Sequence, residues 1–181
     1  MSDAVLSVRE LTKLDIDLVV NYWLTADDTF LEGMGVDLTK MFNRAAWIAM
    51  LQKQLDTPIE EKQSYCLIWL VDGKPIGHSN VNKIIFGQEA YMHLHIWYPD
   101  ARGKGYGVDL IKLSLPYFFK NLQLKKLYCE PYALNASPNK TMEKVGFSFV
   151  KEHITIPGTL NFEQPANLWE LTYDNFKTLN L

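Results

Sequence analysis

The residue pattern with the clearest chemical meaning is the glycine-rich segment Arg102-Gly103-Lys104-Gly105-Tyr106-Gly107. It follows a strand-like run from Tyr91 to Tyr98 and precedes a helical pattern from Val108 to Leu122. A glycine turn at the start of a helix leaves backbone N–H groups unpaired at the positive end of the helix dipole, which suits a phosphate or pyrophosphate. Glycine also lets the backbone approach an anion closely. The segment predicts a phosphate-bearing ligand, unless it is an ordinary tight strand–helix loop.

His93 and His95 are a second candidate for chemistry, because the side chains of a strand alternate and these two share one face. Either imidazole could take up a proton through a water molecule at neutral pH. An H-x-H pair can also bind a metal ion, but no third ligand accompanies it, so we expect no metal site. The alternative is that both are hydrogen-bonded strand histidines without a catalytic role.

A third candidate is the segment that follows the first helical pattern, where carboxylates lie close to aromatic rings. The residues concerned are Tyr22, Trp23, Asp27, Asp28 and Glu32. Carboxylates beside aromatic faces suit a cationic amine, with a cation–π contact contributing about 0.5–2 kcal/mol. The alternative is a solvated acidic loop whose apolar neighbours belong to the core.

Length and composition restrict the class of protein. The 181 residues fit one domain spanning 1–181, and a hydrophobic content of 48% is enough for a core. A net charge of −3 argues against a nucleic-acid partner. No apolar run approaches the roughly 18 residues that a membrane span requires, and the N-terminus has no signal-peptide pattern. We expect a soluble, cytoplasmic protein with no nucleic-acid or membrane partner.

The elements that must position these groups follow one another without a repeat or an interdomain linker. Strand-like runs cover 5–11, 64–71, 76–86, 89–98, 125–129, 147–156 and 167–173. Helical patterns cover 12–24, 38–55, 108–122 and 137–144, with Thr12 and Asp37 as expected caps. This order predicts an α/β (α+β) fold, in which about four helices flank a mixed sheet of about seven strands.

With the elements in place, the chain resembles the GNAT superfamily of N-acetyltransferases. The resemblance is carried by the turn R-x-x-G-x-G, by Asn135 downstream, and by the pair Gly146-Phe147 that ends the next helix. The run from Asn135 to Phe147 is most similar to the RimJ/RimL-like branch. The family implies a mostly antiparallel sheet that splays between its central strands, and an enzyme that acetylates an amine with acetyl-CoA as co-substrate.

The resemblance also implies where acetyl-CoA would bind. The backbone N–H groups from Arg102 to Gly107 would hold the pyrophosphate. The pantetheine arm would pair with the splayed strand at Ile96, Trp97 and Tyr98, where an N–H at or near Trp97 would polarise the thioester carbonyl. Two asparagines would contact the arm, namely Asn135 and Asn139.

The family resemblance implies only some of the catalytic groups. In relatives of this family a glutamate five residues before the asparagine serves as the base, so Glu130 joins His93 and His95 as a candidate. The alternative is a strand-end carboxylate that is solvated or paired with a lysine.

The general acid departs from the family pattern. Many members place a tyrosine seven residues after the asparagine, and that position is Met142. Either Tyr128, Tyr132 or Ser137 substitutes, or the thiolate leaves without help.

The acceptor is left open by the sequence. The resemblance implies that the segment with Asp27, Asp28 and Glu32 forms one wall of the acceptor site and that 157–164 supplies the other. A protein N-terminus, a polyamine and a small-molecule amine all remain candidates, and a homodimer is possible. A non-catalytic acyl-CoA sensor is the alternative that Met142 favours. A nucleotide enzyme is less consistent, because no G-x-x-x-x-G-K-[ST] loop occurs.

Overall fold

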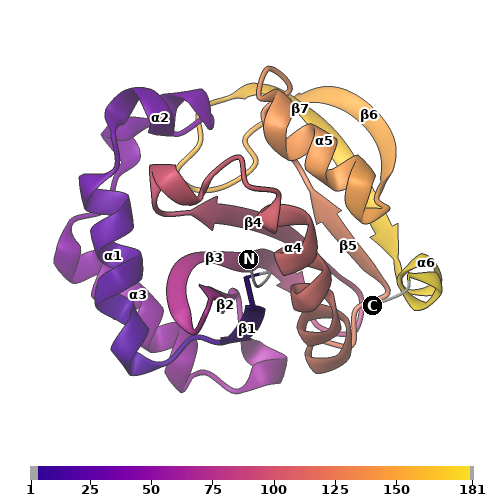
Figure 1. The fold of residues 1–181 in the computed structure, drawn as a ribbon, viewed down its shortest axis with the longest axis horizontal. Helices are drawn as coiled ribbons and strands as arrows, with labels where there is room; N and C mark the ends of the chain where they lie inside the picture. Colours follow the sequence, from indigo (N-terminus) through magenta and orange to yellow (C-terminus); the bar gives the residue numbers. More distant parts are fainter. Residues whose placement is uncertain (1–3, 180–181) are drawn as a thin grey trace.

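The computed structural model describes residues 4–179 and is built on one seven-stranded sheet in the order β1-β2-β3-β4-β5-β7-β6 (Figure 1). The strands are β1 (Leu6–Glu10), β2 (Tyr65–Val71), β3 (Lys74–Ile85), β4 (Glu89–Ile96), β5 (Lys126–Cys129), β6 (Ser148–Thr155) and β7 (Gln164–Thr172). Only β4 and β5 are parallel, and every other neighbouring pair is antiparallel. The predicted mixed, mostly antiparallel sheet is confirmed.

The helices are more numerous than the four predicted. They are α1 (Ile16–Thr25), α2 (Asp28–Gly33), α3 (Arg44–Asp56), α4 (Tyr106–Pro116), α5 (Ala136–Val145) and α6 (Tyr173–Thr178). The additional helices, α2 and α6, have six residues each, which is too short to give a clear apolar period.

The predicted helix over 38–55 is divided in the structure. Asp37 caps only a short 3-10 turn, Leu38–Lys40, and the chain is then extended before α3. Asn43 provides the true cap of α3, because its side chain accepts a hydrogen bond from the Ala46 N–H at 2.9 Å. The apolar period continued through this interruption and concealed it.

The sheet is covered on both faces, and β2 shows how. Leu67 and Trp69 belong to a core cluster that includes α4 and α5, whereas Ile68 and Leu70 belong to a second cluster with α1 and α3. Since successive strand residues point to opposite faces, the two helix pairs lie on opposite sides of the sheet. The near-continuous apolar run of β2 follows from this double burial.

Local signals in the sequence act as predicted at two turns. Asp72 and Gly73 have φ of 50° and 75° between β2 and β3, as a tight hairpin requires. Gly146 has φ of 109° and ends α5. Among the described residues, no helix combines the length and apolar character needed to cross a membrane.

Candidate active site

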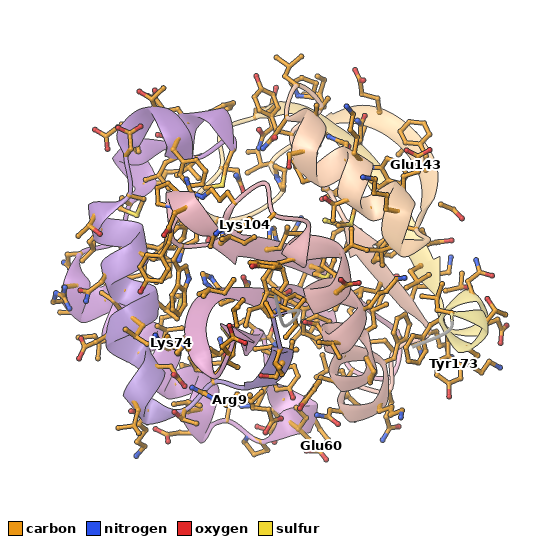
Figure 2. All side chains as sticks on the ribbon, viewed as in Figure 1. Arg9, Glu60, Lys74, Lys104, Glu143 and Tyr173 are labelled. Carbon is orange, nitrogen blue, oxygen red and sulfur yellow. The ribbon has the colours of Figure 1, made fainter. Side chains whose placement is uncertain are left out.

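The glycine-rich turn leads directly into α4. Gly103 and Gly105 have φ of 71° and 84°, and Gly105 is the residue before α4 begins. Beyond the adjacent residues, no atom of the described chain lies within 4 Å of the point where a Cβ would sit on either glycine. Lys104 is exposed at the same turn (Figure 2). The turn therefore offers an open approach to the free N–H groups of the first helical turn, which fits an anionic group.

Arg102 does not take part in the way the motif implies. Its N–H donates to the Pro99 carbonyl at 3.1 Å. Its guanidinium turns back and donates to the carbonyls of Ile96 and Trp97 at 3.0 and 3.1 Å. Arg102 thus fastens the end of β4 to the turn, and the N–H groups free to face an anion are those that follow it.

A gap opens beside the second half of β4. Its parallel pairing with β5 ends at Met92 and Cys129, whereas its pairing with β3 continues to Ile96. In residues 4–179, the edge of β4 beyond Met92 therefore has no strand partner on the β5 side. The predicted splay between central strands is confirmed, and it leaves a peptide-like edge to which a pantetheine arm can bind.

The N–H of Trp97 itself is not free for the role expected at or near this residue. This N–H donates to the Ile76 carbonyl at 2.8 Å, within the sheet. The indole N–H of Trp97 is also committed, because it donates to Nδ1 of His78 at 2.7 Å. Backbone N–H groups alternate between the two edges of a strand, so those of Ile96 and Tyr98 point toward the gap instead.

The two asparagines of the second motif have different environments. Asn139 is fully engaged: it donates to the carbonyls of Tyr132 and Asn135 at 3.1 and 2.8 Å. Its oxygen accepts from the side chains of Asn167 and Trp169, both at 2.9 Å. Asn139 therefore has a structural role, and its amide has no free N–H for the expected cofactor contact. Asn135 is half-buried, and its amide makes no hydrogen bond within the described chain.

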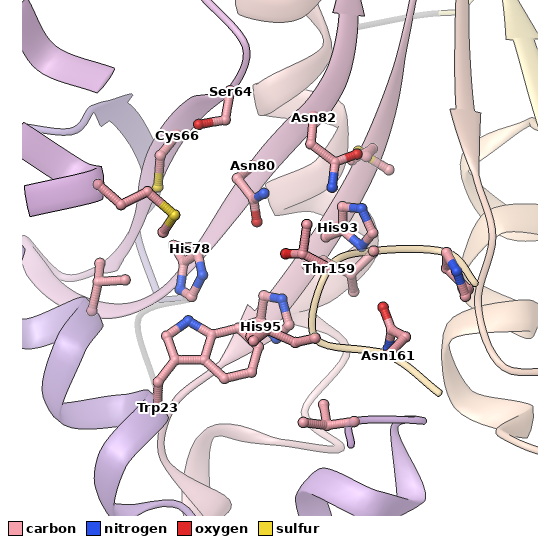
Figure 3. Close-up of a pocket in the computed structure, with 18 of the residues that line it drawn as sticks. Trp23, Ser64, Cys66, His78, Asn80, Asn82, His93, His95, Thr159 and Asn161 are labelled. Carbon is pink, nitrogen blue, oxygen red and sulfur yellow. The ribbon is translucent and has the colours of Figure 1, made fainter. Parts of the chain in front are cut away.

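A cavity of about 700 Å³ covers the sheet face beneath α1 and α3 (Figure 3). Polar side chains from β3 and β4 form its floor: His78, Asn80, Asn82, His93 and His95. Apolar residues of the helices form one wall: Val19, Trp23, Trp47, Met50 and Leu51. The β6–β7 loop forms the other: Pro157, Gly158, Thr159, Leu160 and Asn161. At the gap the cavity is lined by Met92, Cys129, Glu130, Tyr132 and Asn135.

Two of the floor histidines are tied into the core. The rings of His78 and His95 stack with centroids 4.7 Å apart. Nδ1 of His78 accepts from the Trp97 indole, so the proton of a neutral His78 sits on Nε2. Nδ1 of His95 lies 3.2 Å from the Tyr22 hydroxyl. This contact makes His95 a weaker candidate for the base than the sequence suggested.

Burial keeps all three imidazoles neutral. It lowers the pKa of His78 to about 3, with a further contribution from His93. It lowers the pKa of His93 to about 4, where the charge of Lys83 adds to the effect. The pKa of His95 is also lowered by burial and by the neighbouring histidines. At neutral pH these groups can exchange hydrogen bonds, but they hold a transferred proton poorly.

Glu130 is buried at the gap and lies between two basic groups. Its Oε1 is 2.9 Å from Nε2 of His153, and its Oε2 is 3.7 Å from Nζ of Lys83. The residue is only 9% exposed. Glu130 is therefore a cavity-lining carboxylate that is paired with a lysine, as one of the alternatives left open by the sequence described.

Three adjacent strands each bring an unpaired polar atom to this end of the cavity. The atoms are Oδ1 of Asn82 on β3, Nε2 of His93 on β4, and Oε2 of Glu130 directly after β5. All are buried, and none has a hydrogen-bond partner within residues 4–179. Buried polar atoms without a hydrogen bond are costly, so their grouping offers a position for a polar ligand or water: the two oxygens can accept hydrogen bonds, and Nε2 of His93 can accept or donate according to its tautomer.

The β6–β7 loop is held over this floor. A Cβ on Gly158 would lie 3.5 Å from a ring carbon of His93. The loop is fastened to the segment after α2, because the Asn161 amide donates to the Gly35 carbonyl at 2.8 Å. The Asp37 N–H also donates to the Leu160 carbonyl at 2.7 Å. The predicted wall from 157–164 is therefore a fixed part of the cavity.

Of the residues expected to bind the acceptor, the two aromatic ones lie at the cavity and the three acidic ones do not. Trp23 lines the cavity, and Tyr22 is buried beside its floor. The three carboxylates are exposed on or before α2 and do not line the cavity: Asp27, Asp28 and Glu32. Asp27 instead caps α2 by accepting from the Phe30 N–H at 3.0 Å. The expectation of an acidic wall does not hold for this cavity.

The candidates for the general acid differ in whether their side chains line the cavity. Met142 is fully buried in the core between α5 and the sheet. Tyr128 stacks on Tyr91 at 5.1 Å and does not line the cavity. Ser137 is exposed and does not line it either. Tyr132 is the member of this group that reaches the cavity.

Sequence reasoning missed His78, Asn82 and His153 as site residues. His78 lies opposite His95 in the strand register, and Asn82 points to the same face of the sheet although its partner is Tyr91, a relation that only the register reveals. His153 is 23 residues from Glu130 along the chain, and no motif connects them. A pattern of polar residues at alternate positions of β3, unusual beside an apolar β2, was the available signal.

Comparison with known proteins adds independent findings. Residues 6–148 match the family model described as Acetyltransferase (GNAT) domain. Among curated protein sequences, none matches this chain at a significant level.

Several solved structures share the fold at low sequence identity. A spermidine N-acetyltransferase from Vibrio cholerae, in complex with CoA and spermine, superposes with a TM-score of 0.78 at 16% identity, covering 96% of this chain and 98% of its own. RimL, a ribosomal L7/L12 alpha-N-protein acetyltransferase in complex with CoA, gives 0.76 at 11% identity, covering 96% and 97%. Aminoglycoside acetyltransferase AAC(6')-Ib, in complex with CoA and kanamycin, gives 0.74 at 16% identity, covering 98% and 100%.

Proposed function

Since the chain belongs to the GNAT family of acetyltransferases, which use acetyl-CoA as co-substrate, we propose that it acetylates a primary amine by direct attack in a ternary complex. The observation that carries this proposal is the junction of two features. The gap beside β4 opens where its pairing with β5 ends at Met92 and Cys129. Both residues also line the large cavity, as do Leu94 and His95 further along β4, so the gap opens into the cavity along this part of the strand and a thioester in the gap would face an amine in the cavity.

The groups that would hold acetyl-CoA are those that the structure leaves free. The pyrophosphate would lie against the N–H groups from Gly103 to Gly107. The N–H groups of Ile96 and Tyr98 would bind the arm, and the free amide of Asn135 would add a contact. Acetyl-CoA supplies the acetyl group as an activated thioester. The N–H of Ile96 is the donor that we assign to its carbonyl oxygen.

We assign proton removal to Glu130. Its buried carboxylate lies at the gap, and His153 at 2.9 Å fixes its orientation. His93 is the neighbouring alternative, but its pKa of about 4 makes it a weak proton acceptor. We therefore assign His93 to orienting the amine through a hydrogen bond at Nε2. Tyr132 is the group we propose to protonate the leaving thiolate.

The proposal also extends to the branch of the family, the acceptor class, the oligomeric state and the location. The amino-acid sequence from Asn135 to Phe147 supports placement in the RimJ/RimL-like branch. The fold neighbours named above are structures of enzymes for a polyamine, an aminoglycoside and a protein N-terminus, so the fold accommodates several amine classes. A homodimer and a cytoplasmic location remain part of the proposal.

A thiol-release assay tests the function. The protein is incubated with acetyl-CoA and a panel of monoamines, polyamines, aminoglycosides and short peptides, while calorimetry measures acetyl-CoA binding separately. Amine-dependent release of free CoA is the expected result. Tight acetyl-CoA binding without release for any amine would instead identify an acyl-CoA-binding protein.

A further inference from the structure

We propose that the cavity takes an acceptor with a single amino group on an otherwise uncharged, largely apolar body, and that it discriminates against polyamines and aminoglycosides. This inference rests on the proposed function, because it concerns the acceptor side of the same site. It is carried by three observations: the charges that line the cavity, the position of the unpaired polar atoms, and the chemistry of the wall.

The charges that line the cavity are few and balanced. Two acidic residues line it, Glu61 and Glu130, together with two basic ones, Lys53 and Lys62. Glu61 and Lys53 are exposed at the rim. Glu130 already faces Lys83 at 3.7 Å and His153 at 2.9 Å. Beyond Glu130, the lining carboxylate among the described residues is the exposed Glu61, so the buried part of the cavity offers no second carboxylate to a further ammonium group.

The floor adds no negative charge. Its five polar side chains are two asparagines and three histidines, and burial lowers the pKa of each histidine below 6.5. They are neutral at pH 7, so they neither attract nor repel a cation strongly. A buried ammonium without a counter-charge loses its hydration at a large free-energy cost. A polyamine threaded along this floor would meet that cost at each additional ammonium group.

The buried polar atoms without a hydrogen bond are concentrated where one amine would react. Asn82 on β3, His93 on β4 and Glu130 directly after β5 each have such an atom within the described chain, although Oε2 of Glu130 also lies 3.7 Å from Nζ of Lys83. An amino group has the N–H donors to satisfy several such atoms at once. A further unpaired oxygen, Oε1 of Gln164, packs over Gly35 on the loop side.

One wall of the cavity is apolar and aromatic, whereas polar side chains such as Gln54, Gln63 and Ser64 line another part. Trp23 and Trp47 stack with centroids 5.3 Å apart and nearly parallel rings, and the ring of Phe42 meets Trp47 edge-on at 5.3 Å. Sulfur and aliphatic side chains extend this surface: Met34, Val36, Met50, Leu51 and Leu160. Such a wall favours an aliphatic or aromatic body and gives no hydrogen bonds to the hydroxyls of an amino sugar.

The test is calorimetric, with protein saturated with CoA so that no turnover occurs. The probes are 2-phenylethylamine and spermidine, titrated at pH 7.5 and fixed ionic strength. We expect 2-phenylethylamine to bind at least about tenfold more tightly than spermidine. Equal or tighter binding of spermidine, or no binding of 2-phenylethylamine, would overturn the inference. Neither result contradicts the proposed function, because that function is tested separately by thiol release with the full panel of amines and peptides.

A variant that adds a carboxylate to the cavity floor tests whether the lack of negative charge there causes the discrimination against polyamines. Asn80 is half-buried on the cavity floor, opposite His93 in the strand register. Asn80→Asp supplies the missing carboxylate at nearly constant volume and should tighten spermidine binding about tenfold, whereas Asn80→Ser should not. An Asn80→Asp protein that binds acetyl-CoA normally and shows no gain for spermidine would overturn the charge argument. The wild-type comparison decides the inference even if this variant does not fold.

Discussion

Nε2 of His153 lies 2.9 Å from Oε1 of Glu130, although His153 belongs to β6 and Glu130 directly follows β5, which is not a neighbour of β6. Strand β7 runs between them, and the β7 residue paired with His153 is Ala166. Ala166 is fully buried, and its small side chain leaves room for the imidazole to reach across the strand. The contact couples the sheet edge at β6 to the gap beside β4.

Glu130→Gln should abolish most turnover while leaving acetyl-CoA bound. Removal of a general base typically lowers kcat by about 10²–10⁴-fold, and Gln keeps the volume of the side chain. Thiol release measures turnover, and calorimetry measures acetyl-CoA affinity. Glu152→Gln, on the exposed part of β6, is the matched control and should behave as wild type. Retention of full activity by Glu130→Gln would remove this residue from the mechanism.

His153→Ala should lower kcat about tenfold with little change in KM, because a hydrogen bond to a charged group contributes about 1.5–3 kcal/mol. His153→Gln should recover part of the loss, since its amide can still donate to Glu130. A residue that acts only in folding would instead lower the melting temperature and leave kcat per folded molecule unchanged. Steady-state kinetics and thermal unfolding of both variants separate these outcomes.

Gly105→Ala should weaken acetyl-CoA binding by about tenfold or more, because φ of 84° at the start of α4 costs a non-glycine residue about 1–2 kcal/mol. Relaxation of that strain would redirect the N–H groups of the turn. Gly73→Ala is the control: its φ of 75° imposes similar strain in the β2–β3 hairpin. The two variants should lose similar stability, and only Gly105→Ala should lose affinity. Equal affinity in both would place the pyrophosphate elsewhere.

The asparagines of the second motif should separate binding from stability. Asn139→Ala removes four hydrogen bonds and should lower the free energy of unfolding by about 2–4 kcal/mol. Asn135→Ala removes an amide that makes no hydrogen bond within residues 4–179 and should weaken acetyl-CoA binding with little loss of stability. Urea unfolding and calorimetry on each variant provide the two readouts. The reverse pattern would show that the roles are exchanged.

Acidification should destabilise the fold before any carboxylate titrates. In the unfolded chain the floor histidines take up protons below a pKa of about 6.5, whereas in the folded chain the pKa of His78 is lowered to about 3 and that of His93 to about 4. The unfolded state therefore binds more protons between these values, and stability falls as the pH drops.

The loss should reach at most about 1.4 kcal/mol per pH unit for each such histidine. Melting temperatures between pH 7 and pH 5 measure it. His93→Asn should reduce the slope by the share of one histidine. A melting temperature that stays constant over this range would contradict the neutral, buried state of the imidazoles.

The sequence predicted the strands and the glycine turn because local signals determine them, whereas the splay between central strands was implied by the family resemblance. Alternating apolar runs, the Asp72-Gly73 hairpin and the glycines before α4 each act within a few residues. The same locality explains the failures. Whether the Trp97 N–H is free depends on Ile76 in another strand, and whether Asn139 is free depends on Asn167 and Trp169 in β7.

The acceptor side was the least predictable part. The carboxylates around Asp27 have the composition of an amine site, but the short helix α2 turns them to the surface. The actual floor combines β3 and β4 through their register, which places Asn80 opposite His93 and His78 opposite His95. No spacing in the sequence encodes a register between strands, so these residues emerge only in the folded chain.

The most direct test of the account is mass spectrometry of the products formed from acetyl-CoA and 2-phenylethylamine. We predict that N-acetylated 2-phenylethylamine and free CoA accumulate in equal amounts, and that Glu130→Gln forms neither at a comparable rate. Free CoA without the acetylated amine would mean hydrolysis rather than transfer. That result, or the absence of both products from a protein that binds acetyl-CoA and the amine, would contradict the central claim.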